Sequence, residues 1–211
     1  MAARTLRIVV LVIVAFAAGL LLARLLAPGH AAPPATEVAT VLSTPRALPT
    51  LELNDQDGRA LGPDFFRGHW TLVFFGFTQC PDICPTTLAT LAQATQALAD
   101  LPASQQPRVL LVSVDPERDT AEILAPYVRF FDADFMAARG SPEATAAAAA
   151  AFAVPYAKVS LPDGGYTLEH GSGLFLVGPA GELLGYFSAP HDAGKIARDY
   201  RAIVHWAEAG R

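Results

Sequence analysis

Long apolar runs alternate with amphipathic segments along most of this chain of 211 residues. Residues 70–77 and 109–114 are nearly continuous apolar runs, the pattern of strands buried on both faces of a sheet. The segments that follow them, residues 85–98 and 120–131, carry apolar side chains at helical spacing. Strands that alternate with helices at this interval predict parallel βαβ units with right-handed crossovers.

The last third of the chain adds two short strands and a helix. Residues 173–177 and 182–187 are apolar runs joined by Gly178-Pro179-Ala180-Gly181, which predicts a hairpin. Residues 191–209 have the pattern of an amphipathic helix that covers one face of a sheet. These elements together predict an α/β fold, a thioredoxin-like sandwich with a mixed sheet and helices on both faces.

The N-terminal residues predict a membrane anchor. Residues 8–23 form an uncharged apolar run that extends, through Arg24, to Ala27. As a helix this run is about 30 Å long, the thickness of the hydrocarbon core of a bilayer. We therefore expect one N-terminal transmembrane helix within residues 1–28. Arg4 and Arg7 predict a cytoplasmic N-terminus.

A secretory signal that is cleaved is the alternative for residues 1–28. Under either interpretation the rest of the chain lies across the membrane. The N-terminus lacks the Arg- and Ser-rich pattern of a mitochondrial presequence, which favours a bacterium. We expect a single-pass protein of the bacterial inner membrane with its domain in the periplasm, or a periplasmic protein released by signal cleavage.

The remaining chain divides into a tether and one domain. Residues 29–49 are rich in Pro, Ala and Thr without helical or strand periodicity, which predicts a semi-extended tether. Residues 50–211 have a length that suits one domain with its own core. The net charge of −5 and the lack of a basic cluster argue against binding of nucleic acid.

The chain has two cysteines, Cys80 and Cys84, directly behind the apolar run at residues 70–77. Residues four apart share one face of a helix, so the two sulfurs can converge to form a disulfide or to bind a metal ion. A purely structural disulfide is the alternative, but closing so short a loop stabilises a fold by only about 2 kcal/mol. Cys84 precedes Pro85 at a predicted helix start, where the helix dipole is expected to ease ionisation of the thiol.

A histidine would complete a site for a soft metal. Of the five histidines, His170 lies at the start of the predicted hairpin, where a loop could face the cysteines. Two thiolates and one imidazole match Cu(I), or Cu(II) with a further oxygen ligand. Asp115 lies at the carboxyl end of its strand and has two possible roles. It orients the site or accepts a proton there, or it caps the turn that follows.

Three segments resemble the Sco/SenC family. They are residues 75–88, residues 112–120 and the loop that contains Glu169 and His170, in the order in which the family has them. The resemblance implies a membrane-tethered copper protein that helps assemble the CuA centre of cytochrome c oxidase. It also implies Cys80, Cys84 and His170 as copper ligands. Glu169 stands where the family commonly has Asp, so it is expected to orient the imidazole.

Two functions follow from this site. A metallochaperone would deliver copper, Cu(I) or Cu(II), to the CuA-bearing subunit, with a periplasmic copper donor and a dithiol reductant as further partners. A thiol-disulfide oxidoreductase would instead use Cys80 and Cys84 as a redox-active pair to reduce the cysteines of that subunit. Loss of His170 should weaken copper binding in the first case and leave disulfide exchange largely intact in the second.

Overall fold

The computed structural model describes residues 7, 10–19, 22, 32–162 and 164–210. Contacts divide the chain into two units, of which the larger spans Pro33–Ala209. In the N-terminal unit residues 10–19 are helical. Within the described ranges no helix is both long enough and apolar enough to span a membrane. The rest of the predicted anchor, residues 1–6, 8, 9, 20, 21 and 23–28, lies outside them.

A mixed seven-stranded sheet in the order β1-β9-β8-β3-β4-β5-β2 forms the centre of the larger unit. Its strands are β1 (Ala39–Ala47), β2 (Asn54–Asp55), β3 (Trp70–Gly76), β4 (Pro107–Ser113), β5 (Met136–Arg139), β8 (Leu174–Val177) and β9 (Glu182–Phe187). β3, β4 and β5 are parallel to one another, and the other pairings are antiparallel. The predicted central strand and terminal hairpin are thereby confirmed.

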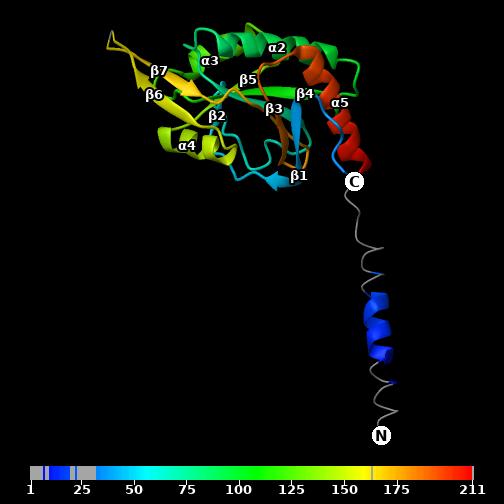
Figure 1. Cartoon of the computed structure of the whole chain (residues 1–211). Coiled ribbons are helices and arrows are strands. Elements are labelled where there is room, and N and C mark those ends of the chain that lie inside the picture. The colour runs from blue at the N-terminus through cyan, green and yellow to red at the C-terminus, as the bar shows by residue number, and fades with distance from the viewer. Residues whose placement is uncertain (1–6, 8–9, 20–21, 23–31, 163, 211) are drawn as a thin grey trace. The chain divides into compact units, whose positions relative to one another are not determined.

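Helices cover both faces of this sheet (Figure 1). They are α2 (Ile83–Ala97), α3 (Ala121–Arg129), α4 (Pro142–Ala151) and α5 (Ala193–Ala209). α2, α3 and α5 lie on one side and α4 lies on the other. This arrangement follows from the chain order, because the crossovers β3-α2-β4 and β4-α3-β5 have the same hand and progress in one direction across the sheet. The α/β sandwich with a mixed sheet is therefore as predicted.

A second sheet of two antiparallel strands stands apart from the first. It pairs β6 (Tyr156–Ser160) with β7 (Tyr166–His170), with Tyr156 opposite His170. Most side chains of both strands are partly or fully exposed, and Leu168 is the buried one. This hairpin is not predicted from the sequence, because neither strand is an apolar run.

β1 corrects the prediction of a tether at residues 29–49. Residues 39–47 form an edge strand that pairs with β9, with a shift in register between Val41 and Arg46. Pro45 lies in that irregular stretch, where an edge strand tolerates a residue without an N–H group. The strand is mostly exposed and so lacks the alternating pattern on which the prediction relied. The sheet therefore begins before residue 50.

The start of β1 is tied to α5 by one buried carboxylate. Asp199, which is 3% exposed, accepts hydrogen bonds from the backbone N–H groups of Glu37, Val38 and Ala39 at 2.7–3.0 Å. Three donors directed at one carboxylate form a strong, charge-assisted attachment. This attachment fixes where the chain enters the domain.

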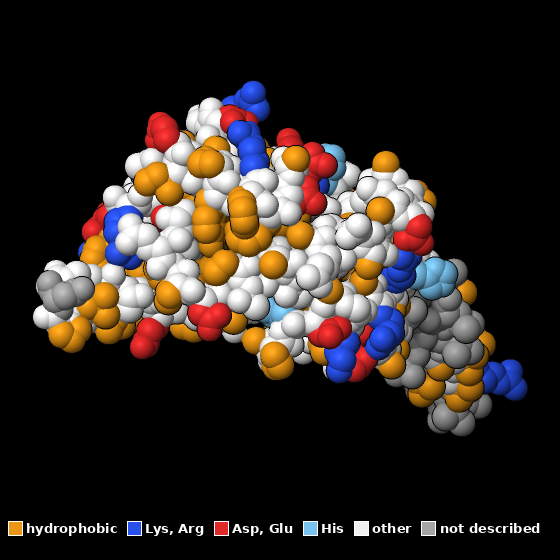
Figure 2. Space-filling model, turned by 90° about the horizontal axis from the view of Figure 1, so that it is seen from above, with side chains coloured by type: hydrophobic (Ala, Val, Ile, Leu, Met, Phe, Trp, Pro, Cys, Tyr) orange, Lys and Arg blue, Asp and Glu red, His pale blue; other side chains and the backbone are white. Residues whose placement is uncertain are grey.

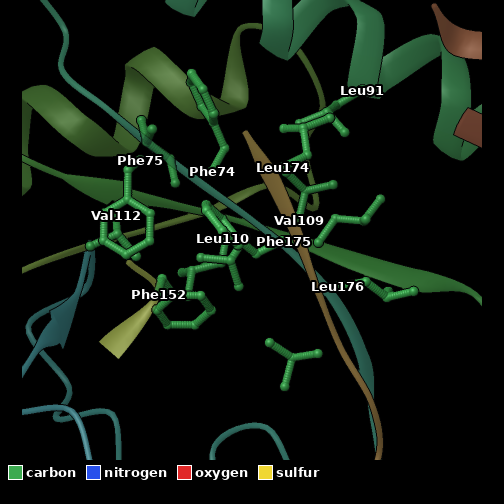
Figure 3. Packing of buried hydrophobic residues seen from close by; sticks show 14 of the residues in the cluster. Phe74, Phe75, Leu91, Val109, Leu110, Val112, Phe152, Leu174, Phe175 and Leu176 are labelled. Carbon is green, nitrogen blue, oxygen red and sulfur yellow. The ribbon is translucent and has the colours of Figure 1, made fainter. Parts of the chain in front are cut away.

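The core packs both faces of β3 and so fixes the strand that leads to the cysteines. All seven residues of β3 are buried. Figure 3 shows its Phe74 and Phe75 among apolar side chains of neighbouring strands and helices. The ring of Phe75 lies 5.3 Å from that of Phe152, which lies 5.4 Å from that of Phe175. Each such side chain stabilises the fold by about 1.5–3 kcal/mol through burial.

Candidate metal centre

The two thiols lie where β3 ends and α2 begins. β3 ends at Gly76, the following loop carries Cys80, and Cys84 is in the first turn of α2. The N-cap residue Asp82 makes no capping bond with its side chain. Instead the N–H of Cys84 is directed at the sulfur of Cys80, 3.4 Å away. Both cysteines are free and buried, at 9% and 0% exposure, so the strand-to-helix turn itself brings the sulfurs together.

Gly76 makes room for Cys84. A Cβ atom at this position would lie 2.9 Å from the Cys84 sulfur and 2.9 Å from the Phe74 ring. Real Cβ atoms do not approach heavy atoms so closely. A side chain at residue 76 is therefore incompatible with this position of the thiol.

His170 comes from the second sheet and faces the thiols. It ends β7, and its Nε2 lies 3.4 Å from the sulfur of Cys84. Its Nδ1 lies 3.0 Å from the carbonyl oxygen of Gly171, an acceptor, so Nδ1 carries the proton and Nε2 presents its lone pair. The rings of Phe74 and Phe77 pack edge-on against the imidazole at 6.0 and 5.9 Å. Burial lowers the pKa of His170 and keeps the ring neutral.

The ligand atoms of Cys80, Cys84 and His170 all lie within 4.8 Å of one another. One metal ion can therefore contact all three after small adjustments of the side chains. Two thiols and a neutral imidazole form a donor set that suits Cu(I), and no carboxylate belongs to this group. The geometry brings together the three residues that the sequence analysis named as ligands.

Burial reverses the expected ionisation of Cys84. The helix start was expected to ease loss of the proton, but burial raises the pKa of the Cys84 thiol, and the neighbouring Cys80 raises it further. A helix terminus contributes about 0.3–1 kcal/mol at an exposed site, whereas full burial shifts a pKa by up to about 3–5 units. The free thiol is therefore protonated at neutral pH, and a metal ion must displace that proton.

The SCO1/SenC family model matches residues 42–205, which is most of the chain. This chain belongs to the SCO1/SenC family. The match includes both thiols and His170. It also includes most of β1, in agreement with its place in the sheet.

Related proteins share this region. A putative copper-binding protein of Stutzerimonas stutzeri is 38% identical over 156 residues, which are 72% of this chain and 75% of that protein. The mitochondrial SCO2 homologue of Bos taurus is 36% identical over 150 residues, 71% of this chain but only 56% of that protein. The chain thus spans little more than half the length of this mitochondrial relative.

A solved structure shares the fold. The crystal structure of Arabidopsis thaliana ScoI with copper bound matches with a TM-score of 0.67 and 29% identity, over 79% of this chain and 98% of that one. The α/β sandwich is thus the Sco fold of the family.

Asp115 contacts the β6–β7 hairpin of this Sco fold and not the thiols. It is 2% exposed, and its carboxylate accepts bonds from Arg118 Nε at 2.5 Å and from the Tyr166 hydroxyl at 2.8 Å. Its backbone carbonyl, rather than its side chain, closes the following turn by accepting N–H bonds from Arg118 and Asp119. Its side chain therefore does not cap the turn, and its link to the site runs through Tyr166 of the strand that ends at His170.

Glu169 does not orient the imidazole. Its side chain is exposed in β7, and neighbouring residues of a strand point to opposite faces. No hydrogen bond or ion pair joins it to His170 in the described part of the chain. The Gly171 carbonyl, one residue after His170, takes the role that the sequence analysis gave to Glu169.

Asp119 is the buried carboxylate beside the loop of Cys80, and the sequence alone did not predict it. It is 0% exposed and accepts bonds from the Thr78 hydroxyl at 2.5 Å, from the Thr78 N–H at 3.2 Å and from the Ser113 hydroxyl at 2.6 Å. Burial raises the pKa of this carboxyl group. These bonds hold the start of the loop on the end of β4. The available signal was the second aspartate of the segment after β4, four positions beyond Asp115.

Proposed function

We propose that this chain is a copper metallochaperone. It binds one copper ion through the sulfurs of Cys80 and Cys84 and Nε2 of His170, and delivers it to the CuA-bearing subunit of cytochrome c oxidase. The convergence of these three ligand atoms within 4.8 Å carries the proposal. The copper-bound ScoI structure and the relative described as copper-binding support the choice of metal.

The surroundings of the ligands define how the ion is held. The Gly171 carbonyl fixes the tautomer of His170, so the imidazole is ready to bind without losing a proton. Cys84 loses its proton when copper binds, which links affinity to pH. Cys80, at 9% exposure, is the more accessible thiol. A thiolate of the acceptor therefore exchanges with Cys80 first while Cys84 and His170 still hold the ion.

The face that carries α2 and α3 offers a contact surface for the acceptor. Viewed from this side, hydrophobic side chains gather near the middle of the surface (Figure 2). Exposed apolar residues here are Ile83 of α2, Ile123 of α3 and Phe130 directly after α3, at 40%, 45% and 84% exposure. Ile83 lies between the two cysteines in the chain, so an acceptor that reaches the ion also covers Ile83.

An anaerobic Cu(I) competition titration of the reduced full chain tests this function. The wild type is compared with His170→Ala and with the double variant Cys80→Ser/Cys84→Ser. We expect one tight equivalent that weakens without His170 and disappears without the thiols. Absence of tight binding by the reduced wild type would refute the copper function.

The same sulfurs support a second function, reduction of a disulfide in the acceptor subunit. They lie close enough to form a disulfide after a small movement. The two thiols would then give up two electrons and two protons, and the acceptor disulfide would become two thiols. A disulfide-bonded peptide from the CuA loop, followed by thiol quantification, tests this function. His170→Ala should retain the exchange, and failure of the wild type to exchange would exclude it.

We also propose that residues 1–28 anchor the protein in the bacterial inner membrane with the domain in the periplasm. The apolar run behind Arg4 and Arg7 supports this location. A periplasmic copper donor and a dithiol reductant are the further partners that the chemistry requires. Mass spectrometry of the protein from washed membranes distinguishes an intact anchor from a cleaved signal.

A further inference from the structure

The hairpin that carries His170 has no strand partner in the main sheet. β6 and β7 pair only with each other within the described residues. A two-stranded hairpin is at best marginally stable in water by itself. Contacts with the rest of the domain must therefore hold it at the distance that places Nε2 of His170 beside Cys84.

Arg118 connects the hairpin to the segment after β4. Its Nε donates to Asp115 at 2.5 Å, and its Nη1 donates to the backbone carbonyl of Tyr166 in β7 at 2.9 Å. The guanidinium also lies 3.7 Å from the centre of the Tyr166 ring. One planar cation thus contacts the main chain and the ring of a hairpin residue while it is bound to a buried carboxylate.

The same guanidinium reaches the metal centre through one aromatic ring. It lies 5.9 Å from the centre of the Phe77 ring, and that ring lies 5.9 Å from the imidazole of His170. Phe77 is buried in the loop that leads to Cys80. Arg118 therefore contacts both strand β7, which ends at His170, and the ring that packs against this imidazole.

A second cation on the hairpin provides a comparison. Lys158 of β6 lies 3.8 Å from the centre of the Tyr166 ring and pairs with Glu117 at 2.8 Å. The side chains of this pair are 47% and 59% exposed, and such pairs contribute about 0–1 kcal/mol. The pair of Arg118 and Asp115 is 22% and 2% exposed, so its bonds are shielded from water.

From these contacts we infer that Arg118 is a positioning residue for His170. It clamps the β6–β7 hairpin to the segment after β4 and thereby sets the distance from Nε2 of His170 to the thiols. This inference rests on the proposed copper function. Arg118 contacts none of the three ligands itself, so its effect on copper passes through His170.

The test variants distinguish the loss of the Arg118 contacts from the cost of leaving a buried charge unpaired. Removal of Arg118 alone would leave Asp115 as an unpaired buried carboxylate, which destabilises the fold for a separate reason. Arg118→Met/Asp115→Asn removes both charges and keeps a side-chain oxygen at residue 115 that accepts the hydrogen bond from the Tyr166 hydroxyl. Lys158→Met removes the exposed cation over the same ring and serves as the control. Arg118→Lys keeps the charge but loses the planar fork that bonds Asp115 and the Tyr166 carbonyl from two nitrogens. It replaces the double variant if the latter does not fold.

Cu(I) affinities are measured on the reduced full chain for each variant, with and without His170→Ala. We expect the Arg118 variant, Arg118→Met/Asp115→Asn, to bind Cu(I) about tenfold more weakly, as is usual when a group that orients a ligand is substituted. Lys158→Met should keep the wild-type affinity. In the His170→Ala background the Arg118 variant should cause no further loss. In the variant Arg118→Met/Asp115→Asn with His170 present, the electron paramagnetic resonance spectrum of the Cu(II) form should lose the coupling to the imidazole nitrogen. Unchanged affinity, or an equal loss without His170, would overturn the inference.

A metal-free measurement keeps the inference separate from the copper function. Amide hydrogen exchange in β6 and β7 should become faster in the Arg118 variant, while exchange in β3 and β4 stays as in the wild type. If the wild type does not bind copper, the proposed function fails. The hydrogen-exchange rates in β6 and β7 then test by themselves whether Arg118 holds the hairpin. Unchanged exchange in the hairpin would overturn it.

Discussion

Gly76 determines how closely Cys84 approaches the end of β3. Its missing side chain leaves the space that the Cys84 sulfur and the Phe74 ring occupy. We predict that Gly76→Ala destabilises the fold by about 1–3 kcal/mol, the usual cost of adding a methyl group to a packed core. Because the thiol must move, Cu(I) affinity should also fall. Urea unfolding and the Cu(I) titration measure the two effects.

Gly62→Ala is the control for this prediction. A Cβ atom at Gly62 has no heavy atom within 4 Å, and its backbone does not require glycine. This variant should keep wild-type stability and affinity. If Gly76→Ala behaves like Gly62→Ala, the close contact at Cys84 does not constrain the site.

His191 should make stability depend on pH. Burial lowers the pKa of His191, whose Nε2 lies 2.7 Å from the Ser172 carbonyl and whose Nδ1 is buried without a hydrogen-bond partner. The unfolded chain binds the proton near the ordinary value of about 6.5, while the folded protein binds it only at lower pH. The free energy of unfolding should therefore fall as pH drops below about 6.5.

His191→Gln should reduce this dependence on pH. Urea unfolding between pH 5 and pH 8 gives the slope for each protein. Part of the slope should remain, because burial also lowers the pKa of His69 and of His170. Equal slopes for His191→Gln and the wild type would contradict the prediction.

Individual ligands were predictable from the sequence because each is a rare residue type in an informative place. The two cysteines follow a buried strand, and His170 belongs to a family motif. Arg118 and Asp119 lie within another motif, but their roles depend on partners 48 and 41 residues away in the chain, respectively. No local pattern encodes such contacts. Glu169 was assigned from its neighbour His170, whereas strand geometry turns the two side chains apart.

At the scale of elements, β1 covers the edge of the sheet at β9. We predict that a chain begun at Leu51 is less stable by at least about 3 kcal/mol than one begun at Pro33. Without residues 37–39, Asp199 loses its three charge-assisted N–H bonds, and β9 loses its pairing with β1. β9 would also become an exposed edge that pairs with other copies. Thermal unfolding and light scattering measure both effects.

The chain begun at Pro33 is the reference for this prediction. It keeps β1 and should match the full chain in stability. Equal stability of both shortened chains would show that β1 contributes nothing to the fold.

Elements buried on both faces were predictable, and those at the periphery were not. β3 and β4 are continuous apolar runs because helices cover them on both sides. β1 and the β6–β7 hairpin are held largely by backbone pairing and by single buried side chains such as Asp199 and Leu168. Backbone pairing leaves no hydrophobic pattern in the sequence.

At the scale of the whole molecule, the metal centre takes its ligands from two parts of the fold that share no strand pairing. Cys80 and Cys84 belong to the β3-α2 connection, and His170 belongs to the second sheet. A copper ion bound to all three would link the hairpin to the core. Since such a site does not exist in the unfolded chain, copper should stabilise the folded protein.

We predict that the copper-loaded full chain unfolds at a higher temperature than the reduced, metal-free protein. Free copper at about a hundredfold above the dissociation constant contributes about 2.7 kcal/mol. For a domain of this size each kcal/mol raises Tm by about 2–4 °C, so the expected rise is roughly 5–11 °C. Anaerobic calorimetry with buffered Cu(I) measures it, and removal of copper by a chelator should restore the lower Tm. His170→Ala should show a smaller rise and Cys80→Ser/Cys84→Ser none. An equal rise in the variant without thiols would place the stabilising copper elsewhere and contradict a centre that joins the hairpin to the core.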